Sequence, residues 1–404
     1  MYHKKIMEDI AGEILDAYSQ CMEPDLRIEG SKSFDYSSFL RVAGRHAAGM
    51  WKVQSSAVTT IGCDVRAYEA GSGSLCVMAW SQMHGNEPVS TLALLDVMNF
   101  VESGGRLAVW LRSRYRMVMI PLLNPEGHQL HNRRNAMGID INRDAQDLVS
   151  PEARFLMREF QLTGPDLALN LHDQEDTYTP GPSRYQTLIS LLAPECGCDG
   201  SVTPCRERAM GVCASVGRML QGLYPDRISR YQDSYTPTAF GDTFMRMGAS
   251  AVLIEAGAYQ GDRLRTVARK AMFLSIIAAM VYYGLGRFRP DGYGSLPVNC
   301  RDRVFLLRMR GLRINTPGGG FSADIGIRRV KTSLNPEDFA DCFGECRVMG
   351  IGNLDSMAAE YEFDARGYTL VGGCRDMYVT RPADFCIADA SGRIVCVKNL
   401  IANY

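Results

Sequence analysis

The sequence predicts an α/β fold followed by a smaller β-rich domain, and two observations carry this prediction. Between residues 51 and 289, short apolar runs typical of strands alternate with helical segments, an order typical of helices packed on a largely parallel or mixed sheet. After about residue 289, glycine and proline become frequent and short strand-like runs follow one another. We therefore expect a helical extension (1–50) packed on a central α/β domain (51–289), and a small C-terminal β domain (290–404).

The composition supports a globular chain and excludes several classes of partner. The 404 residues are 46% apolar, enough for a large core. The 44 basic and 45 acidic side chains leave a net charge of −1, so no bulk field favours nucleic acid or an anionic membrane. The N-terminus lacks the apolar stretch of an export signal, and no charge-free apolar span is long enough to cross a bilayer. We expect a cytoplasmic protein whose thirteen cysteines are reduced thiols, without nucleic-acid or membrane partners.

Apolar periodicity places the individual elements. Ile6, Ile10, Ile14 and Tyr18 recur at helical spacing and predict an N-terminal helix that packs on the core. Pro88 opens a predicted helix through 89–101. The other predicted helices are 206–223 and 263–283. The strands expected in the α/β domain are 75–80, 117–123, 166–171 and 251–254. Those expected in the C-terminal domain are 304–309, 368–371, 385–387 and 393–397.

Chemically capable side chains follow four of these apolar runs at their carboxyl ends. His84 and Glu87 follow the run 75–80, Asn124-Pro125-Glu126-Gly127 follows 117–123, His172 follows 167–171, and Glu255 follows 252–254. In open α/β sheets, ligands bind outside the carboxyl ends of the strands. The pattern therefore predicts that these groups meet at one sheet edge.

Two histidines and a carboxylate form the ligand set of a catalytic zinc ion. His84, Glu87 and His172 would hold one Zn²⁺ per chain and leave a fourth position for water. A proton acceptor is then needed beside that water, and Glu255 could serve as the general base. Asp173 is either a partner of these ligands or a solvated turn residue, and His128 is expected in a surface loop outside the metal set, together with its neighbour at position 131.

A basic segment from Arg133 to Arg143 contains three arginines and two asparagines within eleven residues. Arginine forks bind carboxylates with two parallel hydrogen bonds, so the segment could grip an anionic end of a substrate. Considered alone, an arginine cluster of this kind is more often a solvated basic loop.

With these motifs in order, the chain resembles the M14 family of zinc carboxypeptidases, in a bacterial-type, intracellular branch. The resemblance covers roughly residues 55 to 285. The motifs that carry it are His84-Gly85-Asn86-Glu87-Pro88, Asn124-Pro125-Glu126-Gly127, Arg133-x-Asn135 leading to Asp140-Ile141-Asn142-Arg143, Leu171-His172 and Ile254-Glu255. The resemblance implies an α/β/α sandwich around a mixed, largely parallel eight-stranded sheet.

The resemblance also assigns roles to residues at the metal. His84, Glu87 and His172 correspond to the zinc ligands, and Glu255 to the base that activates water. Asp140 corresponds to the aspartate that orients the first histidine and fixes the imidazole tautomer.

Further residues correspond to groups that bind substrate. Asn142 and Arg143 would hold the terminal carboxylate, and Arg133 would polarise the scissile carbonyl and stabilise the oxyanion. The family's mobile tyrosine could be Tyr231 or Tyr235, of which we favour Tyr235. Asp144 follows Asn142-Arg143 where secreted members usually carry another asparagine.

These observations lead us to expect a zinc metallo-carboxypeptidase that hydrolyses a C-terminal peptide bond. The alternatives are an amidohydrolase of N-acyl amino acids, resembling aspartoacylase or succinylglutamate desuccinylase, and a muropeptide amidase. A non-catalytic binding module is more remote, because the ligands and the base are all present. We expect the substrate to be a peptide or an N-acyl amino acid with a free carboxylate. The preferred terminal residue, the role of the C-terminal domain and the oligomeric state are left open by the sequence.

Overall fold

The chain forms two compact units in the computed structural model, which describes residues 2–28, 33–197, 200–232, 234–286, 288–330 and 345–402, without the side chains of 2–10, 330 and 402. The first unit comprises Met1–Glu175 and Thr187–Asn299, and the second comprises Asp176–Gln186 and Cys300–Tyr404. The first unit extends beyond the expected boundary at 289 because Tyr293 and Leu296, in the glycine- and proline-rich stretch, are buried in its core.

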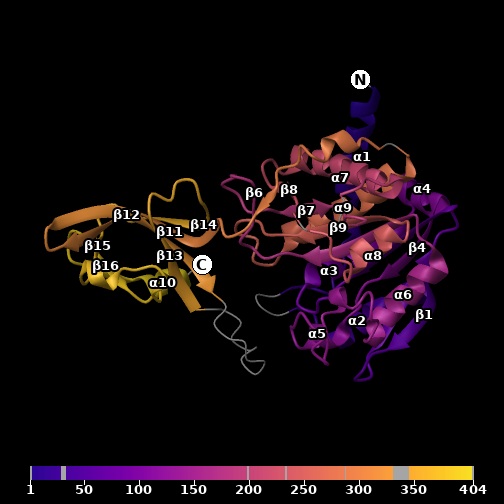
Figure 1. Cartoon of the computed structure of the whole chain (residues 1–404), viewed down its shortest axis with the longest axis horizontal. Coiled ribbons are helices and arrows are strands. Elements are labelled where there is room, and N and C mark those ends of the chain that lie inside the picture. Colours follow the sequence, from indigo (N-terminus) through magenta and orange to yellow (C-terminus); the bar gives the residue numbers. More distant parts are fainter. Residues whose placement is uncertain are drawn as a thin grey trace. The chain divides into compact units, whose positions relative to one another are not determined.

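An eight-stranded mixed sheet forms the centre of the first unit, in the order β1-β2-β4-β3-β5-β9-β7-β8 (Figure 1). Four of the seven neighbouring pairs are parallel. The predicted fold class is thereby confirmed. The strands are β1 (Lys52–Val58), β2 (Asp64–Ala70), β3 (Leu75–Ser81), β4 (Tyr115–Ile120), β5 (Leu167–Asp173), β7 (Ile189–Leu192), β8 (Ile228–Arg230) and β9 (Ser250–Ala256).

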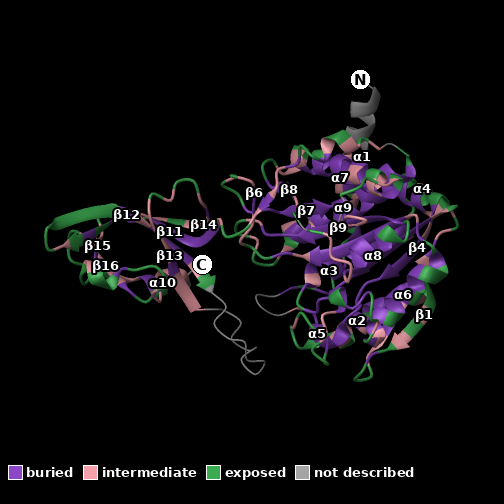
Figure 2. Ribbon diagram, in the orientation of Figure 1, coloured by how far each residue is buried: buried purple, intermediate pink, exposed green. Residues whose placement is uncertain are grey.

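Helices cover the sheet in two layers (Figure 1). One layer contains α1 (Tyr2–Cys21), α3 (Pro88–Glu102), α4 (Arg106–Arg114), α7 (Pro204–Leu223) and α9 (Thr266–Gly284). The other contains α2 (Tyr36–Ala48), α5 (Pro125–Gln129), α6 (Pro151–Thr163) and α8 (Phe240–Arg246). Figure 2 shows that burial is concentrated in the central strands and on the inner sides of these helices.

Two helices are apolar on almost every side, and this explains where they lie. α3 and α9 pack against each other and bury nearly all their residues, as expected of a helix without a polar face. By length and composition α9 could cross a membrane, but 89% of its most apolar window is buried inside the unit, a property it shares with core helices.

Several element boundaries differ from the sequence prediction for physical reasons. The strand predicted over 117–123 ends at Ile120 because Pro121 has no amide proton to donate to a sheet. β1 was not predicted, since most of its side chains are exposed or half-buried and its sequence is largely polar. In the predicted N-terminal helix, Ile14 and Tyr18 are buried, whereas the side chains of Ile6 and Ile10 lie outside the described part.

The second unit has its own seven-stranded sheet and core. Its main path runs β13-β12-β11-β15-β16-β17, and β14 pairs with β11 in parallel. The core contains Leu307, Met309, Ile325 and Ile387. Its elements are β11 (Val304–Thr316), β12 (Gly319–Val330), β13 (Glu345–Gly352), β14 (Ala358–Asp364), β15 (Thr369–Leu370), β16 (Cys386–Ala388), β17 (Ile394–Cys396) and α10 (Val397–Ala402). The short strand β6 (Thr179–Pro180) lies in its first segment, and β10 (Asn299–Cys300) spans the boundary in the chain.

A buried ion pair fastens the segment after α1 to the core of the first unit. Arg269 on α9 donates from Nε and Nη2 to both carboxylate oxygens of Asp96 on α3, at 2.7 and 2.6 Å. The same guanidinium donates to the carbonyls of Leu26 and Glu23, and the Glu23 amide donates to Asp96. The pair therefore joins α3, α9 and residues 23–26.

Replacing Asp96 by alanine is expected to lower the free energy of unfolding by about 3–5 kcal/mol, because the Arg269 guanidinium would stay buried without its partner. Urea titration measures this loss. The matched control is Asp64→Ala, which removes the more exposed partner of Arg66 and is expected to cost at most about 1 kcal/mol. Equal losses in the two variants would contradict the assigned role.

His128 is buried, contrary to its expected place in a surface loop, whereas His131 is exposed. Its Nε2 lies 2.8 Å from the Phe34 carbonyl oxygen, and the Phe34 ring stacks on the imidazole at 4.4 Å. α5 turns the side chain inward, toward the segment that leads into α2. Burial lowers the pKa of His128 to about 4, and the hydrogen bond to the Phe34 carbonyl opposes this shift.

The depressed pKa of His128 predicts a loss of stability in acid. Between about pH 6.5 and 4 the unfolded chain binds a proton at this residue that the folded chain does not, so unfolding is favoured by up to about 3 kcal/mol as the pH falls. We expect His128→Gln to flatten this part of the curve, measured by urea unfolding at pH 7 and pH 5. His131→Gln should keep the slope of the parent protein, and an unchanged slope in His128→Gln would refute the assignment.

Candidate metal centre

The first two predicted metal ligands lie where the chain passes from β3 into α3. β3 ends at Ser81, and His84 and Glu87 follow in a short turn before Pro88 opens the helix. Proline suits this first helical position because its missing amide proton would have no partner there. Both ligand side chains are buried, so the turn directs an imidazole and a carboxylate to the inside.

The third predicted ligand comes from the neighbouring strand. His172 is near the carboxyl end of β5, which pairs in parallel with β3. Its Nδ1 lies 2.8 Å from Glu87 Oε2 and 3.1 Å from His84 Nδ1, and His84 Nδ1 lies 2.8 Å from Glu87 Oε1. The potential ligand atoms of the three residues all lie within 4.8 Å of one another.

This donor set fits a zinc ion. Zinc–nitrogen bonds of about 2.0–2.1 Å bring two ligating nitrogens to a little over 3 Å from each other, close to the separation of the two Nδ1 atoms. Two imidazole nitrogens and a carboxylate are also the ligand types that zinc prefers over hard cations. His84, Glu87 and His172 could thus hold Zn²⁺ and leave a position for a further ligand.

Asp140 and Arg133 surround the first ligand. Asp140 Oδ1 lies 3.2 Å from His84 Nε2, so the imidazole donates from Nε2 and keeps its Nδ1 lone pair toward the other ligands. Arg133 donates from Nε to Asp140 at 3.0 Å, and its Nη1 lies 3.6 Å from Glu87 Oε1. Asp140, predicted to orient His84, and Arg133, predicted to stabilise the oxyanion, therefore both lie beside the predicted metal ligands.

The electrostatics of the cluster favour charged carboxylates and a nearby cation. Burial opposes ionisation of Glu87, but His84 and His172 outweigh it and hold its pKa well below the usual range. For Asp140, His84 and Arg133 outweigh burial in the same way and lower its pKa. Burial would lower the pKa of His84, but the Glu87 and Asp140 carboxylates raise it.

The candidate base lies on the next strand. Glu255 on β9 is the direct register partner of His172 on β5, so it is adjacent to the metal ligands although it comes 83 residues later in the chain. Burial raises its pKa to about 8; His172 opposes this shift, and the Glu87 and Asp173 charges add to it. A buried carboxylate that readily takes up a proton suits a general base.

Asp173 is a structural partner of the site rather than a solvated turn residue. Its carboxylate accepts hydrogen bonds from the amides of Val89 and Ser90 and from the Ser90 hydroxyl, at 2.8–3.2 Å. These groups belong to the first turn of α3, whose own N-cap residue, Glu87, makes no side-chain capping bond. The Asp173 amide also donates to Glu87 at 3.2 Å. Sequence patterns of helix capping involve residues close to the helix in the chain. A cap provided by Asp173, on another strand, therefore could not be predicted from the sequence.

The Asn124-Pro125-Glu126-Gly127 motif supports the metal turn. Asn124 accepts from the Gly127 amide and donates to the Met83 carbonyl. A side chain at Gly85 would place its Cβ 1.9 Å from the Gly127 carbonyl carbon, so only glycine allows the two backbones to approach this closely. The motif thus contributes support rather than ligands.

The basic segment is folded, with one buried and one exposed end. η1 (Ile141–Arg143) is capped by Asp140, which accepts from the Asn142 amide. Asn142 is buried, and its Oδ1 accepts from the Phe240 amide at 3.1 Å, while the Arg143 side chain is exposed. A solvated basic loop, the alternative for this segment, therefore fits the exposed Arg143 but does not fit the buried Asn142.

The two candidate tyrosines flank the undescribed residue 233. Tyr231 continues from β8, its amide donating to Leu191 at 2.9 Å, and Tyr235 is half-buried in the segment before α8. Among the described contacts, none joins Tyr235 to the metal ligands. The choice between the two remains a prediction.

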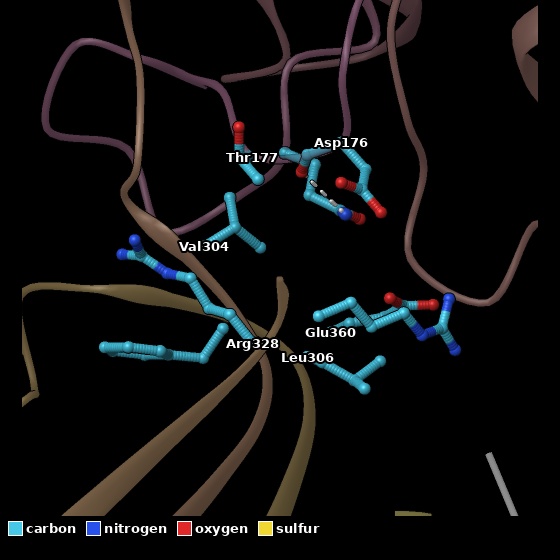
Figure 3. Close-up of a pocket in the computed structure, with 9 residues that line it drawn as sticks. Asp176, Thr177, Val304, Leu306, Arg328 and Glu360 are labelled. Carbon is cyan, nitrogen blue, oxygen red and sulfur yellow. Dashed lines mark hydrogen bonds between the residues drawn. The ribbon is translucent and has the colours of Figure 1, made fainter. Parts of the chain in front are cut away.

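A separate cavity lies in the second unit. Figure 3 shows Val304, Leu306, Arg328 and Glu360 around it, with Asp176 and Thr177 from the first segment of that unit. None of the proposed metal ligands lines this cavity. The predicted metal ligands and the candidate base all lie in the first unit.

Comparison with known families identifies part of the first unit. The family described as zinc carboxypeptidase, Peptidase_M14, matches residues 49–162. This stretch includes His84, Glu87 and the segment from Asn124 to Arg143. His172 and Glu255 lie beyond it and reach the site through the strand register.

Curated relatives match the same region. Probable carboxypeptidase 2 of Trichophyton verrucosum is 28% identical over 107 residues, which are 26% of this chain and 21% of the relative. Carboxypeptidase SOL1 of Arabidopsis thaliana is 33% identical over 72 residues, 17% of this chain and 15% of the relative. The chain thus spans about a fifth, or less, of the length of these relatives.

Solved structures share the fold. A metallo-carboxypeptidase from Pseudomonas aeruginosa, in complex with (2-guanidinoethylmercapto)succinic acid, has a TM-score of 0.51 and 17% identity over 63% of this chain and 70% of its own. Carboxypeptidase A from Helicoverpa armigera has a TM-score of 0.50 and 14% identity over 70% of this chain and 81% of its own. Residues 49–162 are thus similar to the zinc carboxypeptidase family, and the chain shares the fold of these two solved carboxypeptidases over 63–70% of its length.

Proposed function

We propose that the chain is a zinc-dependent metallo-carboxypeptidase that releases the C-terminal residue of a peptide. One observation carries the proposal: the ligand atoms of His84, Glu87 and His172 converge within 4.8 Å, and Glu255 is the register partner of His172 on the next strand. Ligands and base are therefore fixed by the same sheet.

Zinc, when bound, would supply Lewis-acid polarisation of the scissile carbonyl and make water easier to deprotonate. Glu255 would take the proton from the attacking water and return it to the leaving amine. Arg133, beside Glu87 and Asp140, could donate hydrogen bonds to the oxygen that becomes negative.

Asn142 and Arg143 are proposed to hold the terminal carboxylate. Because Asn142 Oδ1 is occupied by the Phe240 amide, its Nδ2 group is the part left to donate to an anion. The exposed guanidinium of Arg143 adds a charge-assisted donor of the fork type that suits carboxylates. A ligand with carboxylates in the Pseudomonas aeruginosa relative is in keeping with this assignment.

The first test measures metal content and hydrolysis together. We expect about one zinc per chain, loss of activity on chelation and recovery with added Zn²⁺. Glu255→Gln should keep the metal and lower kcat by about 10²- to 10⁴-fold, as expected for a lost general base. Glu207→Gln, an exposed change on α7, is the control. A protein without zinc, or full activity in Glu255→Gln, would refute the function.

The second test concerns the substrate carboxylate. On a peptide with a free C-terminus, Arg143→Ala should lower kcat/KM by about 10- to 100-fold, because a charge-assisted hydrogen bond is lost. The same peptide with an amidated C-terminus should be a poor substrate for parent and variant alike. Arg154→Ala, an exposed arginine on α6, should change neither rate. Equal losses on both substrates would remove Arg143 from carboxylate binding, and preference for N-acyl amino acids over peptides would contradict a carboxypeptidase.

A further inference from the structure

Gln82 has a backbone conformation that its residue type disfavours. It lies between the end of β3 and the first proposed ligand, two residues before His84, with a φ of 52°. This is the left-handed region, which glycine enters freely and other residues rarely occupy. The residue is also fully buried. Uncommon backbone conformations of this kind persist when the surroundings hold them, and they concentrate at functional sites.

The side-chain amide of Gln82 has a partner for each of its polar atoms. Nε2 donates to the Gly85 carbonyl at 2.7 Å and contacts His128 Nδ1 at 2.6 Å, which uses both of its protons. Oε1 lies 2.7 Å from Thr91 Oγ1 and accepts from it. A buried amide with every bond satisfied is a strong constraint on its neighbours.

The three partners come from three elements around the metal turn. Gly85 lies between the ligands His84 and Glu87, Thr91 is in the first turns of α3, and His128 is on α5. Since Nδ1 of His128 accepts, its Nε2 carries the proton and donates to the Phe34 carbonyl at 2.8 Å. The hydrogen bonds therefore run without interruption from the metal turn to the segment before α2.

The packing around the turn leaves little room for another arrangement. The Gly85 backbone is pressed against that of Gly127, and the Gly85 amide faces the Arg133 carbonyl at 3.4 Å. Gln82 fixes the remaining free group of Gly85, its carbonyl. The orientation of the peptide between His84 and Glu87 thus depends on the Gln82 amide.

We propose that Gln82 is a positioning residue of the metal centre, which holds the turn from His84 to Glu87 in its ligating geometry and ties it to α3, α5 and Phe34. The proposal rests on the proposed function, because it assumes that these ligands bind a metal. It explains why glutamine occupies a backbone position that glycine would adopt without strain: the side-chain bonds offset the backbone cost.

Two substitutions at Gln82 separate backbone from side chain. Gln82→Gly relieves the backbone conformation and removes the bonds, while Gln82→Met keeps the size and removes the bonds. We expect both to weaken zinc binding by about 10- to 100-fold, the range for groups that orient metal ligands. Competition with a chromophoric chelator measures the zinc dissociation constant, and the visible spectrum of the cobalt(II)-loaded protein reports any change in coordination geometry.

Two controls keep the test decisive. Asp226→Gly relieves a φ of 60° at an exposed turn and should leave zinc affinity and the cobalt spectrum unchanged. Thr91→Val removes the hydroxyl that bonds Gln82 Oε1 and that also contacts the Pro121 carbonyl and Ser81 Oγ. Because it leaves both Gln82 Nε2 contacts in place, it should lower zinc affinity less than Gln82→Met does. If Gln82→Met fails to fold, Gln82→Gly and Thr91→Val still give the answer.

The outcomes distinguish this inference from the function on which it rests. If the parent protein binds zinc and hydrolyses peptides while Gln82→Gly and Gln82→Met match its zinc affinity and cobalt spectrum, the positioning role is refuted and the function stands. A parent protein that binds no zinc refutes both. Weakened zinc binding with an altered cobalt spectrum, and kcat reduced at saturating zinc with little change in KM, supports the role.

Discussion

A cluster of buried carboxyl groups at the carboxyl ends of three parallel strands is the constraint on which the first unit depends. Glu87, Asp173 and Glu255 lie together with the two imidazoles, and among the described residues Arg133 is the arginine that pairs with the Glu87 carboxylate. Burial of several carboxylates is costly unless a cation or donors compensate them. The proposed zinc ion would supply that compensation, and Asp140, the α3 amides and the strand register arrange the groups around it. Metal binding and stability of this sheet edge are thus coupled.

The sequence identified the groups that end apolar runs, because burial of a strand and the polarity of the next residue are both local properties. His84, Glu87, His172 and Glu255 were found in this way, and the structure brings them together. The support around them was not predictable. Asp173 caps a helix that begins 85 residues earlier in the chain, and Gln82 reads as an ordinary polar residue until its φ and its partners are known. Both depend on contacts through space, for which a single sequence carries no periodic signal.

Two sets of buried hydrogen bonds connect the N-terminal extension to the rest of the first unit. Arg269, paired with Asp96, donates to the carbonyls of Glu23 and Leu26, and His128 donates from Nε2 to the carbonyl of Phe34. The second set continues through Gln82 into the metal turn. The extension therefore does more than cover apolar surface. The carbonyl of Phe34 accepts a hydrogen bond from His128, which in turn contacts Gln82 beside the predicted ligands.

The chain enters the second unit at Asp176, four residues after His172, returns to the first at Thr187, and leaves it again after Asn299. Neither unit is a continuous piece of the gene. A stop codon after residue 299 would delete most of the second unit but keep its first eleven residues, Asp176–Gln186, without their partners. For the same reason, a single recombination joint could not exchange one unit between homologues. We therefore expect the two units to be inherited together, because neither can be gained or lost as a separate continuous segment.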